Sequence, residues 1–230
     1  MKRMLCCMMV MIASLCYKYA VGNVYVVIYA TIDGKTGHAG IAVDNYRIQT
    51  INGRTDTVAD GTLTYYDLWP EQDDFRLFHI STNRSGKFYK LPNAIWPGEI
   101  TLNSLYDNGI PHREYYPCDG LLMMRTGAME DHSLKIYLDW IMQCGRSFNA
   151  RYYNCSDFVL QAINKVTGQH IRAKEFIPLT FSTTPNKLCR KLMKRGDVTV
   201  LKSPGKKIKG SFFRERVLKR KAPPTLFAIN

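Results

Sequence analysis

Several patterns that would point directly to a function are missing from this chain of 230 residues. It has no G-x-S-x-G turn, the strand-to-helix turn on which many serine hydrolases carry their nucleophile. It also has no internal repeat and no low-complexity segment, and its content of 46% hydrophobic and 12% aromatic residues is that of an ordinary globular protein. We therefore expect one domain that buries its own hydrophobic core.

Cysteine is scarce beyond the first twenty residues, where Cys118, Cys144, Cys155 and Cys189 are the only four. That density is too low for a disulfide-stapled scaffold, although a single bridge among Cys118, Cys144 and Cys189 stays open. No two of the four have C-x-x-C spacing and none clusters with histidines. We therefore expect neither a structural zinc site nor any other cofactor.

Long apolar runs are also missing after residue 20, so no later segment is expected to span a membrane. The N-terminus differs, because Lys2 and Arg3 precede an apolar run over residues 4–16. This arrangement predicts that residues 1–20 are a signal peptide, and a buried N-terminal helix is the alternative. Export would leave residues 21–201 as the mature domain, in the bacterial periplasm or envelope.

Acidic residues are few near the C-terminus, and this decides where the charge lies. Residues 187–221 hold 14 of the 32 Lys and Arg but only two acidic residues, so nearly all of the net charge of +13 is there. The basic tail, residues 202–230, is expected to be either a solvated segment or an arm. As an arm, residues 202–221 would bind an anionic membrane or envelope surface. Export argues against nucleic acid as the partner.

The order of predicted elements indicates an α+β fold, in which an antiparallel sheet packs against helices. Strands 38–43 and 46–51 are separated by Asp44-Asn45, which predicts a hairpin with a two-residue turn. Residues 52–74 are rich in Gly, Thr and Asp and are expected to be a loop, and prolines interrupt residues 83–119. The other predicted elements are strands at 23–32, 75–81, 120–125 and 198–201 and helices at 131–144, 155–166 and 186–195.

The strongest functional signal surrounds Cys155. Asn154 is a good helix N-cap, and Asp157 follows at the position that bonds back to the cap, which places Cys155 in the first turn of a helix. There the helix dipole and free backbone N–H groups stabilise a thiolate, the reactive form of cysteine, and can donate to an oxyanion. Cys155 is therefore the candidate nucleophile, with a buried structural cysteine as the alternative.

A candidate general base lies far upstream, at the start of a predicted strand. His38 sits in the small-residue run 37–43, which leaves room for a helix end or a substrate. A cysteine and a distant histidine are the minimum set for acyl-transfer chemistry. With a two-residue turn at 44–45, Gln49 shares a face with His38, one diagonal step away. Gln49 is therefore the candidate residue that orients the ring, and Asn52 and Asp56 take that role if the turn is longer.

These motifs, in this order, resemble the circularly permuted NlpC-type papain-like cysteine hydrolases, a group that includes the lecithin–retinol acyltransferase-like proteins. Gly-His-Ala-Gly-Ile-Ala-Val around His38 matches the strand of the general base, and Asn-Cys-Ser-Asp-Phe-Val around Cys155 matches the helix of the nucleophile. The resemblance spans residues 23–190 in element order and implies a papain-like fold. It also implies a third, polar catalytic position on the strand after His38, where Gln49 is the nearest match.

The resemblance implies a thioester mechanism, in which Cys155 attacks a carbonyl and His38 protonates the leaving group. The substrate implied first is an amide bond in the stem peptides of peptidoglycan. The alternative within the same fold is deacylation or acyl transfer on a lipid or N-acyl amine. A different class of function needs no catalysis, because the basic tail alone would allow the protein to bind an envelope surface. Residues 52–119 match no motif, so the substrate stays open.

Overall fold

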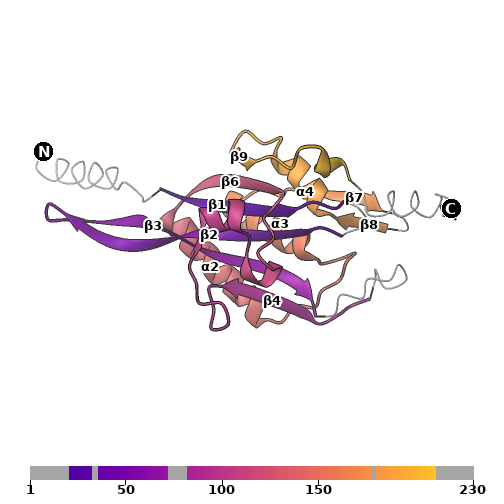
Figure 1. The fold of residues 1–230 in the computed structure, drawn as a ribbon, viewed down its shortest axis with the longest axis horizontal. Coiled ribbons are helices and arrows are strands. Elements are labelled where there is room, and N and C mark those ends of the chain that lie inside the picture. Colours follow the sequence, from indigo (N-terminus) through magenta and orange to yellow (C-terminus); the bar gives the residue numbers. More distant parts are fainter. Residues whose placement is uncertain (1–20, 33–35, 72–81, 178–179, 211–230) are drawn as a thin grey trace, which may run out of the picture.

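The computed structural model describes residues 21–32, 36–71, 82–177 and 180–210. Within these ranges a seven-stranded antiparallel sheet, in the order β4-β3-β2-β1-β6-β9 with β5 beside β3, forms the centre of the molecule (Figure 1). Its strands are β1 (Val21–Tyr29), β2 (His38–Ile51), β3 (Arg54–Pro70), β4 (Gly86–Leu91), β5 (Ile100–Thr101), β6 (Gly120–Gly127) and β9 (Val198–Lys202). The expected α+β class, an antiparallel sheet packed against a few helices, is confirmed.

Along the chain, the α-helices and a small second sheet lie between β6 and β9. The α-helices are α2 (Ala128–Gln143), α3 (Cys155–Thr167) and α4 (Pro185–Leu192), and the antiparallel pair β7 (Lys174–Ile177) and β8 (Thr180–Thr183) lies between α3 and α4. Short helical turns are η2 (Ser104–Asn108), η3 (Pro111–Arg113) and η4 (Gly205–Lys209). None of the helices in the described ranges is long and apolar enough to cross a membrane.

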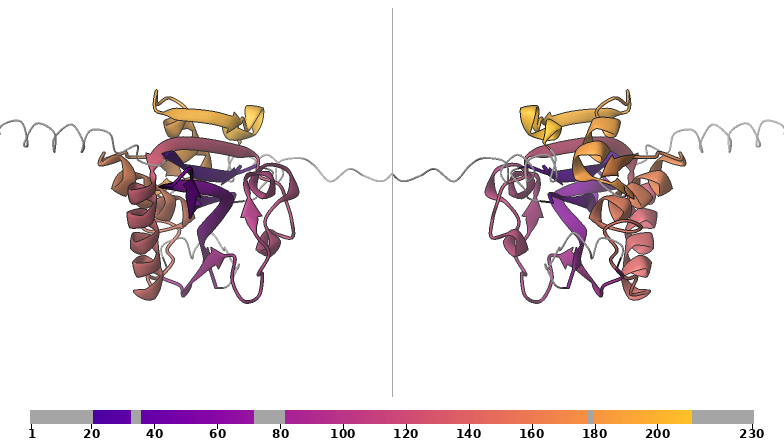
Figure 2. Two further views of the ribbon diagram at one scale, coloured as in Figure 1. Left: turned by 90° about the vertical axis from the view of Figure 1, so that its left-hand side faces the viewer. Right: turned by 90° about the vertical axis from the view of Figure 1, so that its right-hand side faces the viewer.

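The sheet has a hydrophobic cluster on each face. On one face, Val24, Val26 and Ile28 of β1 pack with Phe158 of α3 and Leu134 of α2. The other face carries the alternate residues of β1 and is covered by the segment that contains η2 and η3. The end views show the helices on one side of the strands and this segment on the other (Figure 2). Because both faces of β1 are buried, the strand is apolar along nearly its whole length, as a central strand requires.

The predicted hairpin turn at Asp44-Asn45 is wrong. β2 continues through both residues with only a register shift, and its turn is Asn52-Gly53, where Ile51 pairs with Arg54. Both turn residues have positive φ, 50° and 75°, as a type I′ hairpin turn requires. Asn45 lies at this register shift, and its side-chain amide bonds the hydroxyl groups of Thr62 and Thr64 on β3. The Asn-Gly pair was therefore the real turn signal.

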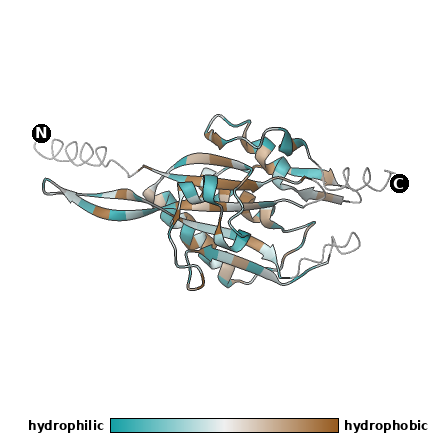
Figure 3. Ribbon diagram, in the orientation of Figure 1, coloured by the Kyte–Doolittle hydropathy of each residue, from teal (hydrophilic) through white to brown (hydrophobic). Residues whose placement is uncertain are grey.

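The predicted loop 52–74 is wrong for the same reason, since β3 occupies Arg54–Pro70. The far part of the β2–β3 hairpin extends beyond the rest of the sheet and is more hydrophilic than the central strand β1 (Figure 3). Ile48 there is 77% exposed. A hairpin that projects into solvent has no buried face, so its sequence lacks a clear alternation of apolar and polar residues. The polar composition of this segment therefore predicted a loop.

The remaining expectations are mostly confirmed. The strands at 120–125 and 198–201 and the three helices are present, although α2 begins three residues earlier than predicted and α4 is the shorter segment Pro185–Leu192. The irregular segment 83–119 contains β4, β5 and two helical turns. All four described cysteines are free, so the bridge that the sequence left open is not formed. The predicted signal peptide, the predicted strand at 75–81 and the tail beyond residue 210 lie outside the described residues.

Candidate active site

The N-terminus of α3 has the cap that the sequence predicts. The Asn154 side chain accepts hydrogen bonds from the backbone N–H groups of Ser156 (2.8 Å) and Asp157 (3.2 Å), and the Asp157 carboxylate accepts one from the Asn154 N–H (3.2 Å). The Asn154 amide is fixed in turn by the carbonyl groups of Ala150 and Thr183. Cys155 is therefore the first residue of a rigidly capped helix, and it is only 8% exposed.

The structure brings His38 and Cys155 together, although 117 positions separate them in the sequence. His38 is the first residue of β2 and pairs with Tyr29 of β1, so the sheet fixes its backbone beside the start of α3. The imidazole lies close enough to the Cys155 thiol for each group to shift the pKa of the other, and the Ala39 backbone N–H also lowers the thiol pKa. A thiol at a helix N-terminus with an imidazole beside it is an arrangement that nucleophilic catalysis by cysteine needs.

The residue that orients His38 is Asp67, not Gln49. Because the β2–β3 turn lies at Asn52-Gly53, Gln49 pairs with Asp56 on the projecting part of the hairpin, whereas Gly40 pairs with Asp67. Asp67 then lies one diagonal step from His38 on the same face, and its Oδ2 is 2.9 Å from His38 Nε2. The fallback residues Asn52 and Asp56 lie at the far end of the hairpin as well.

Asp67 is completely buried and its Oδ2 is the centre of a hydrogen-bond cluster. The Tyr65 hydroxyl donates to it at 2.9 Å and the Trp69 indole N–H at 3.0 Å, and His112 Nε2 lies 2.8 Å away. Gly40 allows this arrangement, because a Cβ at that position would come within 2.0 Å of the Tyr65 hydroxyl oxygen. Buried carboxylates of this kind are retained only when donors surround them.

The cluster shifts the pKa of each catalytic candidate. Burial alone would raise the pKa of Asp67, but hydrogen bonds from His112 and His38 outweigh it and hold the pKa well below its usual range. Burial opposes ionisation of Cys155 too, yet the charge and hydrogen bond of His38 lower the thiol pKa. Burial would lower the pKa of His38, and the neighbouring Cys155 and Asp67 raise it instead. Both directions favour the charged forms of the thiol and the imidazole, and the Asp67 carboxylate supports the imidazolium.

Five residues of the site were missed from the sequence, three on β3 and two on η3. Tyr65, Asp67 and Trp69 alternate along β3 and all face His38, and the Trp69 ring stacks on the imidazole with centroids 4.0 Å apart. Their period of two would have been the signal, had 52–74 been recognised as a strand. His112 and Arg113 come from η3, across the same sheet face, and no local pattern marks them. Only the folded chain brings them to Asp67 and Trp69.

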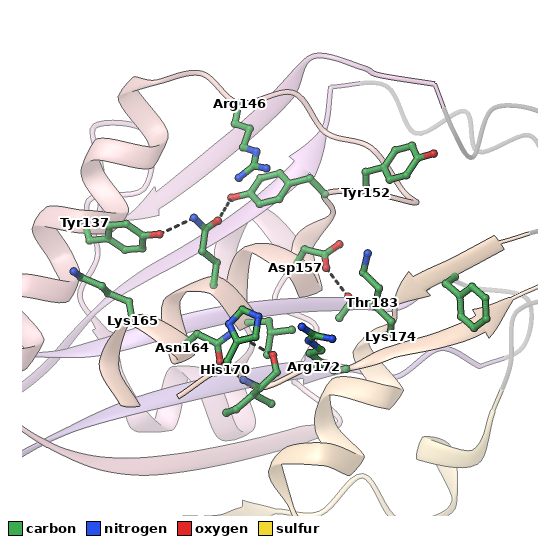
Figure 4. Close-up of a pocket in the computed structure, with 16 residues that line it drawn as sticks. Tyr137, Arg146, Tyr152, Asp157, Asn164, Lys165, His170, Arg172, Lys174 and Thr183 are labelled. Atoms are coloured by element: carbon green, nitrogen blue, oxygen red, sulfur yellow. Dashed lines mark hydrogen bonds between the residues drawn. The ribbon is translucent and has the colours of Figure 1, made fainter. Parts of the chain in front are cut away.

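A cavity of about 820 Å³ lies beside α3 and is not part of this site (Figure 4). Its walls include Asp157, which bonds Thr183, and four cationic side chains from α3 and the segments around it: Arg146, Lys165, Arg172 and Lys174. Neither Cys155 nor His38 lines it. The cavity is therefore separate from the pair formed by Cys155 and His38.

Comparisons with protein-family models, with curated proteins and with solved structures gave no match. In the described ranges, no group of three or more His, Cys, Asp or Glu side chains is placed to hold a metal ion. The site is thus defined by its own geometry. An antiparallel sheet supplies a base and a carboxylate, and a capped helix supplies a thiol.

Proposed function

We propose that this protein is a cysteine hydrolase of the permuted NlpC-type, papain-like group, with Cys155 as nucleophile, His38 as general base and Asp67 as the residue that orients His38. The observation that carries the proposal is the contact between a helix-terminal thiol and an imidazole whose other nitrogen is 2.9 Å from a buried carboxylate. The order along the chain, histidine first, then acid, then cysteine, agrees with the resemblance seen in the motifs.

The mechanism follows from which atoms are already engaged. His38 Nε2 faces Asp67, so Nδ1 is the ring nitrogen that exchanges a proton with Cys155. The thiolate adds to the substrate carbonyl, and the Cys155 backbone N–H, which has no acceptor within the first helical turn, donates to the developing oxyanion. Imidazolium then protonates the leaving amine, and water hydrolyses the thioester with His38 as base. Asp67 keeps the ring in the orientation and tautomer that each step needs.

The test is the alkylation rate of each cysteine against pH, followed by peptide mass spectrometry, in the wild type and in His38→Ala. Cys155 should react well below the reference thiol pKa of about 8.5, and the histidine substitution should abolish that reactivity. Buried Cys118 and Cys189 are internal controls, because burial raises their pKa to about 11 and about 12. Cys144 is exposed, so it is replaced by serine in both proteins to remove a competing thiol. An unreactive Cys155, or one that reacts equally without His38, would contradict the proposal.

The substrate we propose is an amide bond, with peptidoglycan stem peptides as the first class to screen and N-acyl lipids as the second. Both follow from the resemblance and from the predicted export signal. Export itself is tested by N-terminal sequencing of the protein recovered from a bacterial host. Cleavage near Ala20 supports the periplasmic or envelope location, whereas retention of Met1 in the cytosol contradicts it.

A non-catalytic role as an envelope-binding protein is the second candidate, because of the basic tail. The start of this tail is part of the fold, since the Asn186 side chain donates to the Gly210 carbonyl (2.9 Å) and Lys207 pairs with Asp119. A truncation should therefore begin at residue 211, which leaves these contacts intact. Loss of vesicle binding with unchanged turnover of small substrates would assign binding to the tail and catalysis to the domain.

A further inference from the structure

We propose that Arg113 and Tyr29 form a subsite for a carboxylate of the substrate, beside the bond that Cys155 attacks. This inference rests on the proposed function and specifies its substrate class, namely an amide whose neighbouring residue carries a free carboxylate. It also makes Arg113 a specificity-determining residue of the site.

The first observation is a group of buried polar atoms that lack partners. The Tyr29 hydroxyl, Arg113 Nε, His112 Nδ1 and Asp67 Oδ1 are all buried, and none has a hydrogen-bond partner in the structure. Leaving such an atom buried and unpaired costs about 1–3 kcal/mol, so folded proteins rarely keep several in one place. These residues are neighbours of His38: Tyr29 and Asp67 contact it, Arg113 packs on the Tyr29 ring, and His112 bonds Asp67. Three of the four atoms can donate a hydrogen bond, which indicates that an acceptor ligand completes their hydrogen bonding.

The second observation is the charge of Arg113. Its guanidinium carbon lies 4.7 Å from the centroid of the Tyr29 ring and 4.4 Å from that of Trp69, so two aromatic rings contact the cation. Among the described residues no acidic side chain forms an ion pair with it. The buried carboxylate of the site, Asp67, is bonded to the two histidines through Oδ2 and forms no ion pair with Arg113. The guanidinium is therefore a partly desolvated cation without an anion.

The third observation is the position of this cation relative to the dyad. Trp69, which contacts Arg113, stacks on His38, and Tyr29 is the strand partner of His38 with ring centroids 6.2 Å apart. One side chain thus separates the guanidinium from the general base. Because a guanidinium stacked against rings presents its N–H groups at its edge, it binds a planar carboxylate in the bidentate manner, and the Tyr29 hydroxyl adds a further donor.

The experiment uses three matched probes that alkylate the thiol: N-bromoacetylglycine, its amide, and the corresponding aminomethylphosphonate. In each case the Cys155 sulfur displaces bromide and one S–C bond forms, so only the remote group differs. Second-order rates are measured for the full-length protein with Cys144→Ser and divided by the rates for free cysteine, which removes the intrinsic effect of probe charge.

We expect the normalised rate for the carboxylate to exceed that for the amide roughly tenfold, the gain of one charge-assisted hydrogen bond. Arg113→Gln should reduce the ratio of the carboxylate rate to the amide rate to about one, and Tyr29→Phe should lower that ratio. Arg47→Gln, which removes one positive charge from the projecting part of β2, is the matched control and should leave the preference unchanged. If Arg113→Gln does not fold, Arg113→Lys takes its place and should lower the preference.

Two results would overturn the inference while leaving the proposed function intact. One is an equal carboxylate preference in the wild type and Arg113→Gln, with Cys155 still reactive toward the amide. The other is a larger gain for the phosphonate than for the carboxylate, which would assign the subsite to phosphate. A Cys155 that reacts with none of the probes would instead refute the proposed function, and the subsite with it.

Discussion

Replacing Asp67 by asparagine tests the whole arrangement around His38. The substitution keeps the size of the side chain and one acceptor oxygen for the Tyr65 and Trp69 donors, so the fold should survive. What disappears is the negative charge that holds the imidazolium. A hydrogen bond to a charged group contributes about 1.5–3 kcal/mol and a neutral one about 0.5–1.5, so the loss at His38 is about 1–2 kcal/mol. At 1.36 kcal/mol per unit, that corresponds to a rise of about one unit in the pKa of the Cys155 thiol.

The assay is the pH profile of Cys155 alkylation by iodoacetamide in the Cys144→Ser background. The Asp67→Asn rate should be about tenfold below wild type near pH 6, and the two rates should converge above pH 9, where both thiols are ionised. Because the two groups titrate together, the profile reports the pKa values of the pair. Asp44→Asn, a buried aspartate elsewhere on β2, is the matched control and should leave the profile unchanged. An unchanged profile for Asp67→Asn would refute the role we give to Asp67, and a uniform loss at every pH would indicate misfolding.

Three further substitutions test the supporting structure. Asn154→Ala should lower the free energy of unfolding in urea by about 1 kcal/mol, through loss of the α3 cap, and slow Cys155 alkylation; an unchanged value would contradict the capping argument. Gly40→Ala should lower the free energy of unfolding by about 1–3 kcal/mol, since the added Cβ would clash with Tyr65. An unchanged free energy would show that this contact is not tight. Burial raises the pKa of Asp131 to about 6, so its contribution to stability is present below about pH 4 and lost as the pH rises through 6. Asp131→Asn should flatten the stability profile over that interval, and an unchanged slope would refute the assignment.

Local sequence signals predicted the elements whose chemistry is local. The capping pair Asn154 and Asp157 defined the first turn of α3, and with it the position of Cys155, because a cap depends on residues only three apart. The helix predicted at 186–195 begins at Pro185, one residue earlier, with Thr184 as its N-cap. The prediction of the β2–β3 hairpin was wrong because the composition of residues 52–74 was given more weight than the Asn52-Gly53 pair. These two residues have the positive φ that a tight hairpin turn requires. That one error removed β3 from the prediction.

The sequence by itself thus determined the α+β class, the helix that begins at Cys155 and the strand that begins at His38, since each depends on short-range pattern. Only the tertiary structure shows which acidic side chain, Asp67, lies beside His38. Which residue lies beside His38 depends on the register of two long strands, and moving the turn from 44–45 to 52–53 exchanges Gln49 for Asp67. His112 and Arg113 reach the site from η3 through packing across the sheet face, a contact of more than forty residues' separation that no local period encodes.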